Sequence, residues 1–302
     1  MGMRTELKEM ASGFRWGRRS LVPRSAEPHT EPRQERSFPT AWARTSAAVA
    51  ARQTILKFGM KPLLWNEITP RVHGLEHLKD LRGPVLFVSN HTSHIDATMI
   101  MTTLPDEWQA KTAVGAAKDY FFDVWWRQAF TALVYAAFPI DRAGGGKRAT
   151  TMARELLDDG WSLVVFPEGA RSPDGHQQRF RHGASRLSLE SGVPVVPIAI
   201  RGAYQAMPKG RNWPRPGRPP VSIRYGRPLF PREGETHQEL SLRMQRSIAE
   251  LHDEDANTWW VALHRAERGD TPSITGPTGA VWRRKWDGSR PIGRRGPGRT
   301  WE

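Results

Sequence analysis

Short apolar runs alternate with segments of helical periodicity through the middle of this 302-residue chain. The apolar runs have the length and composition of buried strands and cover residues 84–88, 110–117, 162–166 and 221–225. Helices are expected at 97–104, 148–159, 183–190 and about 236–254, with Gly160 and Gly192 as C-terminal stops. This alternation predicts an α/β fold, with a mostly parallel or mixed central sheet flanked by helices.

One further apolar segment, residues 193–200, carries Pro194 and Pro197. Proline cannot donate a backbone hydrogen bond, so it is poorly suited to the middle of a sheet. The segment is therefore expected to be an edge strand or an irregular one.

The two ends of the chain differ from this middle part. Residues 1–40 are rich in Arg, Glu, Pro and Ser and are expected to form a disordered basic tail. Residues 41–65 mix apolar and basic residues, which predicts one or two amphipathic helices at the start of a domain that spans 41–265. Residues 266–302 are expected to be an extended basic segment that docks Trp282 and Trp286 on the domain.

The charge is strongly positive, with a formal net charge of +14 and a pI near 10.8. This balance favours phosphate-rich partners, such as anionic lipid, nucleic acid or phosphorylated metabolites. No acidic residue occurs between Ser191 and Arg232, a stretch that holds eight basic ones: Arg201, Lys209, Arg211, Arg215, Arg218, Arg224, Arg227 and Arg232. They are interpreted either as a solvated face or as a patch that faces membrane or substrate.

Cysteine is absent, which excludes disulfides and thiolate chemistry. No run of 18 uncharged apolar residues occurs, so no membrane-spanning helix is expected, and the N-terminus lacks the apolar stretch of a signal peptide. The aromatic segment 120–138 is too polar to span comfortably. It is interpreted either as a helix at a membrane interface or as a buried core helix.

The first motif, Asn90-His91-Thr92-Ser93-His94-Ile95-Asp96, directly follows the strand at 84–88. Ligands of open α/β sheets collect at the carboxyl ends of strands, and the turn after a strand can return Asp96 to His91. An imidazole oriented by a carboxylate is a suitable base for a hydroxyl group. Two alternatives stay open: helix capping by Thr92 or Ser93 beside a structural His91, and a metal site, which the absence of cysteine disfavours.

The second motif, Phe166-Pro167-Glu168-Gly169-Ala170-Arg171-Ser172, directly follows the strand at 162–166. Glycine allows a turn to approach a ligand closely, and Arg171 could hold a phosphate through two parallel hydrogen bonds, with Ser172 adding another. An ordinary turn with a surface arginine is the alternative. Together, the motifs suggest attack by a hydroxyl on an acyl group of a phosphorylated substrate.

The two motifs in this order resemble the glycerophospholipid acyltransferase family, and within it the lysophosphatidic acid acyltransferase group. The family's first block, Asn-His-x-x-x-x-Asp, is matched by Asn90, His91 and Asp96. Its third block, Phe-Pro-Glu-Gly-Thr-Arg-Ser, is matched except that Ala170 replaces Thr. Three lesser blocks are also matched, by Ala117 and Lys118, by Ile140, Asp141 and Arg142, and by Val193, Pro194 and Pro197.

The resemblance implies roles for these residues. His91 would be the general base and Asp96 its orienting partner. The acceptor's glycerol phosphate head would be bound by Asn90, Lys118, Arg142, Glu168, Gly169, Arg171 and Ser172. No metal and no cofactor are implied.

The resemblance also implies the reaction. A fatty acyl group would pass from acyl-CoA or acyl-carrier protein to lysophosphatidic acid, giving phosphatidic acid, with another lysolipid or glycerol-3-phosphate as alternative acceptors. The enzyme would attach peripherally or monotopically to an anionic membrane at its cytoplasmic face, and no nucleic-acid partner is expected.

If only the residue types are considered, two alternative functions remain open. The first is a non-catalytic module that binds nucleic acid or an anionic surface, supported by aromatic residues among arginines near Trp213 and Tyr225. The second is a phosphatase or other hydrolase. Neither accounts for both motifs together.

Overall fold

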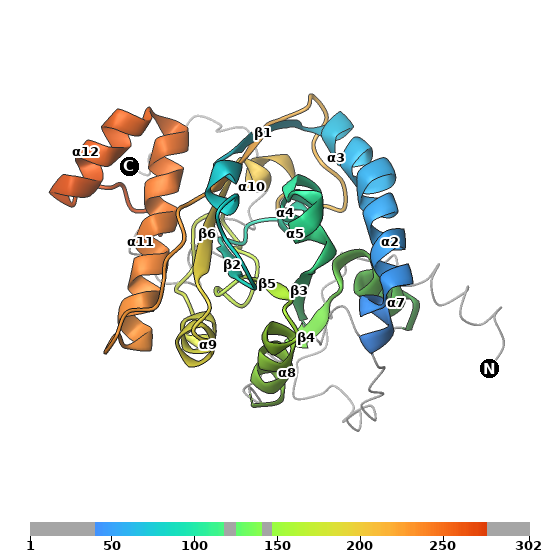
Figure 1. The fold of residues 1–302 in the computed structure, drawn as a ribbon. Helices are drawn as coiled ribbons and strands as arrows, with labels where there is room; N and C mark the ends of the chain where they lie inside the picture. The colour runs from blue at the N-terminus through green and yellow to red at the C-terminus, as the bar shows by residue number, and fades with distance from the viewer. Residues whose placement is uncertain (1–39, 118–124, 141–146, 277–302) are drawn as a thin grey trace, which may run out of the picture. The chain divides into compact units, whose positions relative to one another are not determined.

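The computed structural model describes residues 40–117, 125–140 and 147–276. Within these ranges a seven-stranded sheet has the strand order β1-β7-β6-β2-β5-β3-β4 (Figure 1). Its strands are β1 Thr69–His73, β2 Leu86–Ser89, β3 Thr112–Ala117, β4 Phe138–Ile140, β5 Ser162–Val165, β6 Val195–Arg201 and β7 Pro220–Tyr225. All neighbouring pairs are parallel except β6 with β7. The mixed sheet confirms the predicted α/β class.

Helices cover both faces of the sheet. The first layer consists of α8 Lys147–Asp158, α9 Gly183–Ser191 and α11 His237–Ala256. These helices enclose a core with Leu86 and Val88 of β2, whereas Phe87 of the same strand belongs to the core on the opposite face. Successive side chains of a strand point to opposite faces of the sheet. A strand that is buried on both faces therefore has an uninterrupted run of apolar residues in its sequence.

The second layer includes α4 Ile95–Thr103, α7 Trp125–Tyr135 and the N-terminal helices (Figure 1). The latter are η2 Ala41–Arg44, α2 Ser46–Thr54, the π-helical turn η3 Ile55–Met60 and α3 Lys61–Glu67, which confirms the helices predicted for 41–65. Arg52 of α2 is fully buried and donates to the carbonyl oxygens of Leu133 and Ala43. A buried guanidinium therefore joins α2 to α7 and to η2.

Four shorter or later elements complete the description: η4 Leu75–Leu78, α5 Asp106–Ala110, α10 Ala203–Ala206 and α12 Trp259–Arg268. Helix α11 begins at a capping box, in which Thr236 and Glu239 each bond the other's backbone N–H. Helix α12 ends at Arg268 and so includes the first three residues of the segment 266–302 that was expected to be extended. Trp282 and Trp286 lie outside the described residues, as does the tail predicted for 1–40 apart from Thr40.

Strand β6 is not at an edge, so that prediction is wrong. Pro194 precedes the strand, and its carbonyl oxygen accepts from the N–H of Leu86. Pro197 is opposite Val88 of β2, while β7 pairs with β6 only from Ile198 onward. Pro197 therefore precedes the regular antiparallel ladder, and there it contributes its carbonyl oxygen, which accepts from the N–H of Gly226 at 2.8 Å.

The aromatic segment 120–138 is partly buried and partly exposed where it is described. On α7, Val134 is fully buried, whereas Phe130 is 51% exposed. The helix therefore contributes to the core and also presents an apolar side chain at the surface. Among the residues that the structure describes, no helix is both long enough and apolar enough to cross a bilayer.

The basic residues between Ser191 and Arg232 do not form one patch. Arg224 pairs with Glu254 at 2.7 Å, and Arg201 lies 3.4 Å from Asp255, both partners being on α11. Arg218 donates to the carbonyl oxygens that end α3. The sequence could not show that helix α11 brings carboxylates to the strands that carry these arginines.

Candidate active site

Both motifs lie at one edge of the sheet because their strands are neighbours. Strands β5 and β6 flank β2, and both run parallel to it. The carboxyl ends of the three strands therefore meet, which is where ligands of open α/β sheets bind. The first motif leaves β2 here and the second leaves β5.

His91 and Asp96 form a hydrogen-bonded pair. Asp96 Oδ2 lies 3.0 Å from His91 Nδ1 and also accepts from the backbone N–H groups of Thr92 at 2.7 Å and Ser93 at 2.8 Å. The Asp96 side chain is fully buried, and the His91 side chain is 18% exposed. Because Nδ1 donates to the carboxylate, Nε2 is left to accept a proton.

The capping alternative for this loop is realised in part. Helix α4 has His94 at its N-cap position without a side-chain cap, but Ser93 Oγ accepts a long hydrogen bond of 3.4 Å from the N–H of Ile95. The same Ser93 Oγ donates to the carbonyl oxygen of Met207 at 2.7 Å. The loop after β2 is thus bound to the segment after β6 and held closed around Asp96.

Two further contacts fix the position of His91. Its ring stacks on Phe166, with ring centroids 4.1 Å apart. The preceding Asn90 is 2% exposed, and its side-chain amide bonds both the N–H and the carbonyl oxygen of Ile200, at 2.8 and 2.9 Å. Asn90 therefore joins the end of β2 to the end of β6 and cannot reach a ligand.

Glu168 connects the second motif to the first. Its Oε1 accepts from the N–H of His91 at 2.7 Å, and its Oε2 accepts from the N–H of Gln178 at 2.9 Å. Burial raises the pKa of the Glu168 carboxyl to about 8, against the lowering effect of these two hydrogen bonds. The Glu168 side chain therefore connects the loop that carries His91 to the segment that carries Gln178.

Gly169 and Ser172 shape the turn of the second motif. Gly169 has φ +73°, and a Cβ there would lie 2.7 Å from Nε of Arg181, so only glycine fits without strain. Ser172 is fully buried: its N–H donates to the carbonyl oxygen of His91 at 2.7 Å, and its Oγ lies 3.0 Å from Asp174 Oδ1.

These placements revise the expected substrate contacts. Asn90, Glu168 and Ser172 use their polar atoms inside the protein, so the structure assigns them to holding His91 and its loop. Lys118 and Arg142 lie outside the described residues. Among the expected phosphate ligands that the structure describes, Arg171 lines a pocket of about 630 Å³, as does Glu168.

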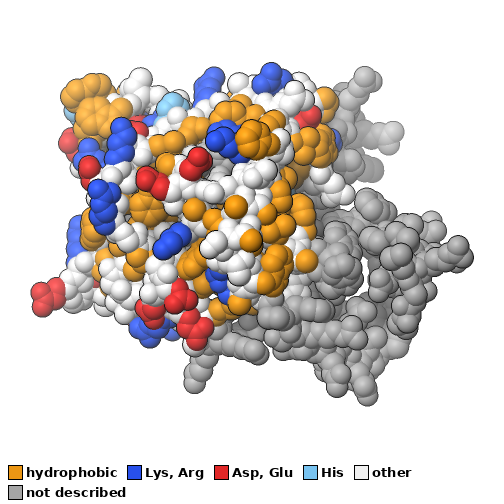
Figure 2. Space-filling view, turned by 45° about the vertical axis from the view of Figure 1, so that its right-hand side comes forward, with side chains coloured by type: hydrophobic (Ala, Val, Ile, Leu, Met, Phe, Trp, Pro, Cys, Tyr) orange, Lys and Arg blue, Asp and Glu red, His pale blue; other side chains and the backbone are white. Residues whose placement is uncertain are grey.

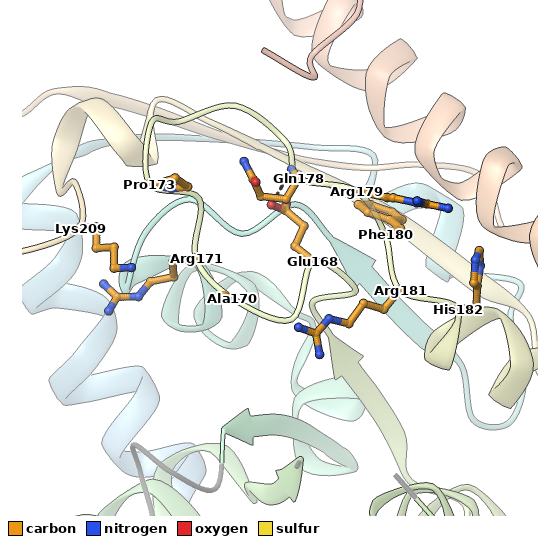
Figure 3. A pocket seen from close by; sticks show the side chains of 10 residues that line it. All are labelled: Glu168, Ala170, Arg171, Pro173, Gln178, Arg179, Phe180, Arg181, His182 and Lys209. Atoms are coloured by element: carbon orange, nitrogen blue, oxygen red, sulfur yellow. Dashed lines mark hydrogen bonds between the residues drawn. The ribbon is translucent and has the colours of Figure 1, made fainter. Parts of the chain in front are cut away.

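The pocket is rich in cations (Figure 3). Arg171 and Lys209 lie on one side of Glu168, and Arg181 lies on the other. The full lining is Glu168, Ala170, Arg171, Pro173, Gln178, Arg179, Phe180, Arg181, His182 and Lys209. Glu168 is the single carboxylate among these residues, so the pocket suits an anion.

Several lining residues were not assigned to the site from the sequence. Arg179 and Arg181 follow the second motif closely, and their spacing of two around Phe180 was an available signal. Lys209 was noted only as part of the basic stretch after Ser191. No local pattern brings it to Arg171, because the two residues come from different strand ends.

The pKa of His94 is affected by its burial and by the nearby charge of Arg171. Burial lowers its pKa to about 4, and the positive charges of Arg171 and His91 add to this effect. His94 is therefore neutral at neutral pH and competes little with the pocket cations for an anion. Within the described part of the chain, no three His, Asp or Glu side chains are grouped to hold a metal ion.

The geometry combines a base with an anion pocket. His91 can accept a proton at Nε2, and Asp96 stabilises the imidazolium that results. Glu168 borders the pocket and binds the backbone of His91, so an anion held by Arg171 would lie close to the base. Such an arrangement can activate a hydroxyl group of a phosphate-bearing substrate.

Comparison with known proteins agrees with this chemistry. The model of the Acyltransferase family matches residues 69–201, from β1 to the end of β6. The matched region therefore includes both motifs and the three strand ends that form the site.

Curated relatives carry a more specific name. A 1-acyl-sn-glycerol-3-phosphate acyltransferase of Limnanthes douglasii is 33% identical over 165 residues, which cover 53% of this chain and 54% of that protein. The alpha form of the enzyme from Mus musculus is 34% identical over 167 residues, covering 51% and 55%. The chain spans about half the length of these relatives.

A solved structure shares the fold. The crystal structure titled 1-acyl-sn-glycerophosphate (LPA) acyltransferase, PlsC, from Thermotoga maritima aligns with a TM-score of 0.57 at 24% identity, covering 72% of this chain and 88% of that one. The family match includes the strand ends that hold His91, Asp96 and Glu168. Residues 69–201 of this chain are thus similar to the Acyltransferase family.

Proposed function

We propose that the protein transfers a fatty acyl group to the free hydroxyl of 1-acyl-sn-glycerol-3-phosphate, giving phosphatidic acid. The observation that carries this proposal is the His91–Asp96 pair beside a pocket lined by Arg171. The names of the curated relatives support the choice of acceptor.

The reaction follows from the arrangement. His91 Nε2 removes the proton from the acceptor hydroxyl as the oxygen attacks the thioester carbonyl carbon of the donor. The tetrahedral intermediate collapses, the C–S bond breaks, and the thiolate leaves. A thiolate is a good leaving group near neutral pH, so a single base suffices, and the proton on His91 returns to solvent or to the thiolate.

The donor in this proposal is acyl-CoA or acyl-carrier protein, and no further cofactor takes part. Both donors present the same thioester to the base. A nucleic-acid partner has no role in the reaction.

A lipid acceptor requires contact with a membrane, and we assign that contact to the N-terminal helices. Phe58 is 73% exposed and Leu63 is 49% exposed, with Lys57 and Lys61 beside them. Figure 2, in which the side that carries α2 and α3 comes forward, shows hydrophobic side chains gathered among basic ones. Aromatic and basic side chains together favour a peripheral or monotopic position at an anionic surface, here the cytoplasmic face.

The test is an acyl-transfer assay on the wild-type protein and His91→Ala. Labelled acyl-CoA and acyl-carrier protein would each be offered with lysophosphatidate, glycerol-3-phosphate and other lysolipids in vesicles. Phosphatidate formed from lysophosphatidate by the wild type, and lost in the variant, is the expected result. Release of free acid without any acylated lipid, from either donor, would favour a hydrolase and contradict the proposal.

A further inference from the structure

We propose that Lys209 binds the phosphate of the acceptor together with Arg171, and that this pair selects phosphomonoester acceptors over lysophospholipids whose phosphate is a diester. The inference rests on the proposed function and adds to it a residue and a head-group specificity. It follows from the position of Lys209, which comes from a part of the chain remote from both motifs.

The segment that carries Lys209 is bound to both loops of the site. Ser93 Oγ in the histidine loop donates to the carbonyl oxygen of Met207 at 2.7 Å. Tyr204 Oη donates to the carbonyl oxygen of Pro173, next to the second motif, at 3.1 Å. The segment therefore cannot move independently of His91 and Arg171.

A tight turn presents Lys209 at its corner. The N–H of Arg211 donates to the carbonyl oxygen of Pro208 at 3.1 Å, and Gly210 takes the left-handed φ of +98°. A left-handed glycine at the third position is the mark of a type II turn, and Lys209 is the second residue of this turn. Lys209 lines the pocket.

The charged ends of Lys209 and Arg171 point toward one another in the pocket (Figure 3). An anion bound between two cations of one concave site is attracted by both of them. The guanidinium can hold two phosphate oxygens at once, and the ammonium adds a point charge with three donors. The pair thus has the donors for a terminal phosphate group.

The charge of the phosphate explains the expected selectivity. A phosphomonoester such as lysophosphatidate has a second pKa of about 6 and is largely dianionic at neutral pH. A phosphodiester keeps a single negative charge and has one terminal oxygen fewer. Arg171 and Lys209 therefore attract the dianionic phosphomonoester more strongly than the monoanionic diester.

The experiment measures binding without turnover. Variants are made in the His91→Ala background, and 1-hexanoyl lysophosphatidate, soluble as a monomer, is titrated by isothermal calorimetry. Lys209→Met is expected to raise the Kd about tenfold or more, as for loss of one charge-assisted hydrogen bond. Lys209→Arg is expected to recover most of the affinity. Lys79→Met, an exposed lysine of the C-terminal end of η4, is the matched control and is expected to leave the Kd unchanged.

Competition then tests the selectivity. Glycerol 3-phosphate and the diester glycerophosphoglycerol are used to displace the lysophosphatidate. In the His91→Ala protein that retains Lys209, glycerol 3-phosphate is expected to displace lysophosphatidate at a lower concentration than the diester does. This difference between the two competitors is expected to be smaller when Lys209→Met is added. An unchanged Kd in Lys209→Met, equal competition by the two probes, or no binding of lysophosphatidate to the Lys209 protein would overturn the inference.

The outcome is separable from that of the proposed function. Tight, Lys209-dependent binding without acyl transfer by the protein with His91 intact would refute the reaction and leave the phosphate site. If the protein transfers an acyl group to lysophosphatidate but Lys209→Met does not change the Kd of lysophosphatidate, the proposed role of Lys209 is refuted and the proposed reaction stands.

Discussion

Asp96 Oδ2 lies 3.0 Å from Nδ1 of His91, and the same oxygen accepts two backbone N–H groups of the loop between them. The carboxylate therefore fixes the backbone of the loop and the tautomer of the imidazole in one arrangement. A residue that orients a base in this way should affect kcat much more than substrate binding.

Asp96→Asn tests this relationship. The amide oxygen can still accept hydrogen bonds, but the negative charge that stabilises the imidazolium is lost, so kcat is expected to fall about 10²-fold or more. The Kd of lysophosphatidate is expected to change little. Steady-state kinetics and calorimetric titration measure the two quantities, and an Asn variant with wild-type kcat would contradict the assigned role of Asp96.

Asn90→Ala should destabilise the protein, although Asn90 touches no substrate in our assignment. Its amide satisfies the N–H and the carbonyl oxygen of Ile200, and both are buried. Leaving these groups without partners is expected to cost about 2–4 kcal/mol of unfolding free energy. Urea denaturation measures the cost. A variant with lower affinity for lysophosphatidate but unchanged stability would return Asn90 to the substrate-binding residues.

Glu168→Gln tests how pH acts through the buried carboxyl. The folded-state pKa of Glu168 is about 8, above its ordinary value of 4.5, so between these values the folded protein binds more protons than the unfolded one. The contribution of Glu168 to stability is therefore fully present below pH 4.5 and is lost as pH rises through about 8. The glutamine variant lacks this titration.

The measurement is the unfolding free energy of both proteins from pH 5 to pH 9. The buried histidines His94 and His252, with pKa values lowered to about 4, contribute equally to both and cancel in the difference. The difference in stability between wild type and Glu168→Gln is expected to fall as pH rises. A constant difference across the range would show that Glu168 does not titrate there.

The exposed apolar residues of the N-terminal helices should determine membrane binding. Phe58→Ser with Leu63→Ser removes apolar surface without removing a core residue, because both side chains are exposed. Cosedimentation with anionic vesicles is expected to decrease about tenfold or more, since burial of one large apolar side chain contributes about 1.5–3 kcal/mol. Leu242→Ser on α11, also exposed, serves as the control, and an equal decrease there would contradict the assigned surface.

The fold class followed from residues that act locally. Apolar runs such as 84–88 are short and uninterrupted because parallel strands are buried on both faces, and the helices between them show their own period. The prediction that β6 is an edge strand was wrong because the effect of Pro197 depends on whether the neighbouring strand extends to the position opposite the proline. That length is set by β7, more than 20 residues away.

By itself, the sequence predicted the groups that the proposed reaction uses. The spacing of His91 and Asp96 is short enough for one turn to bring them together, and the motif after β5 supplied Arg171. Only the tertiary structure decided what surrounds them: Asn90 on Ile200, Glu168 on the backbone of His91, and Lys209 beside Arg171. These contacts depend on β5 and β6 pairing with β2, and strand order arises from long-range packing that no local pattern encodes.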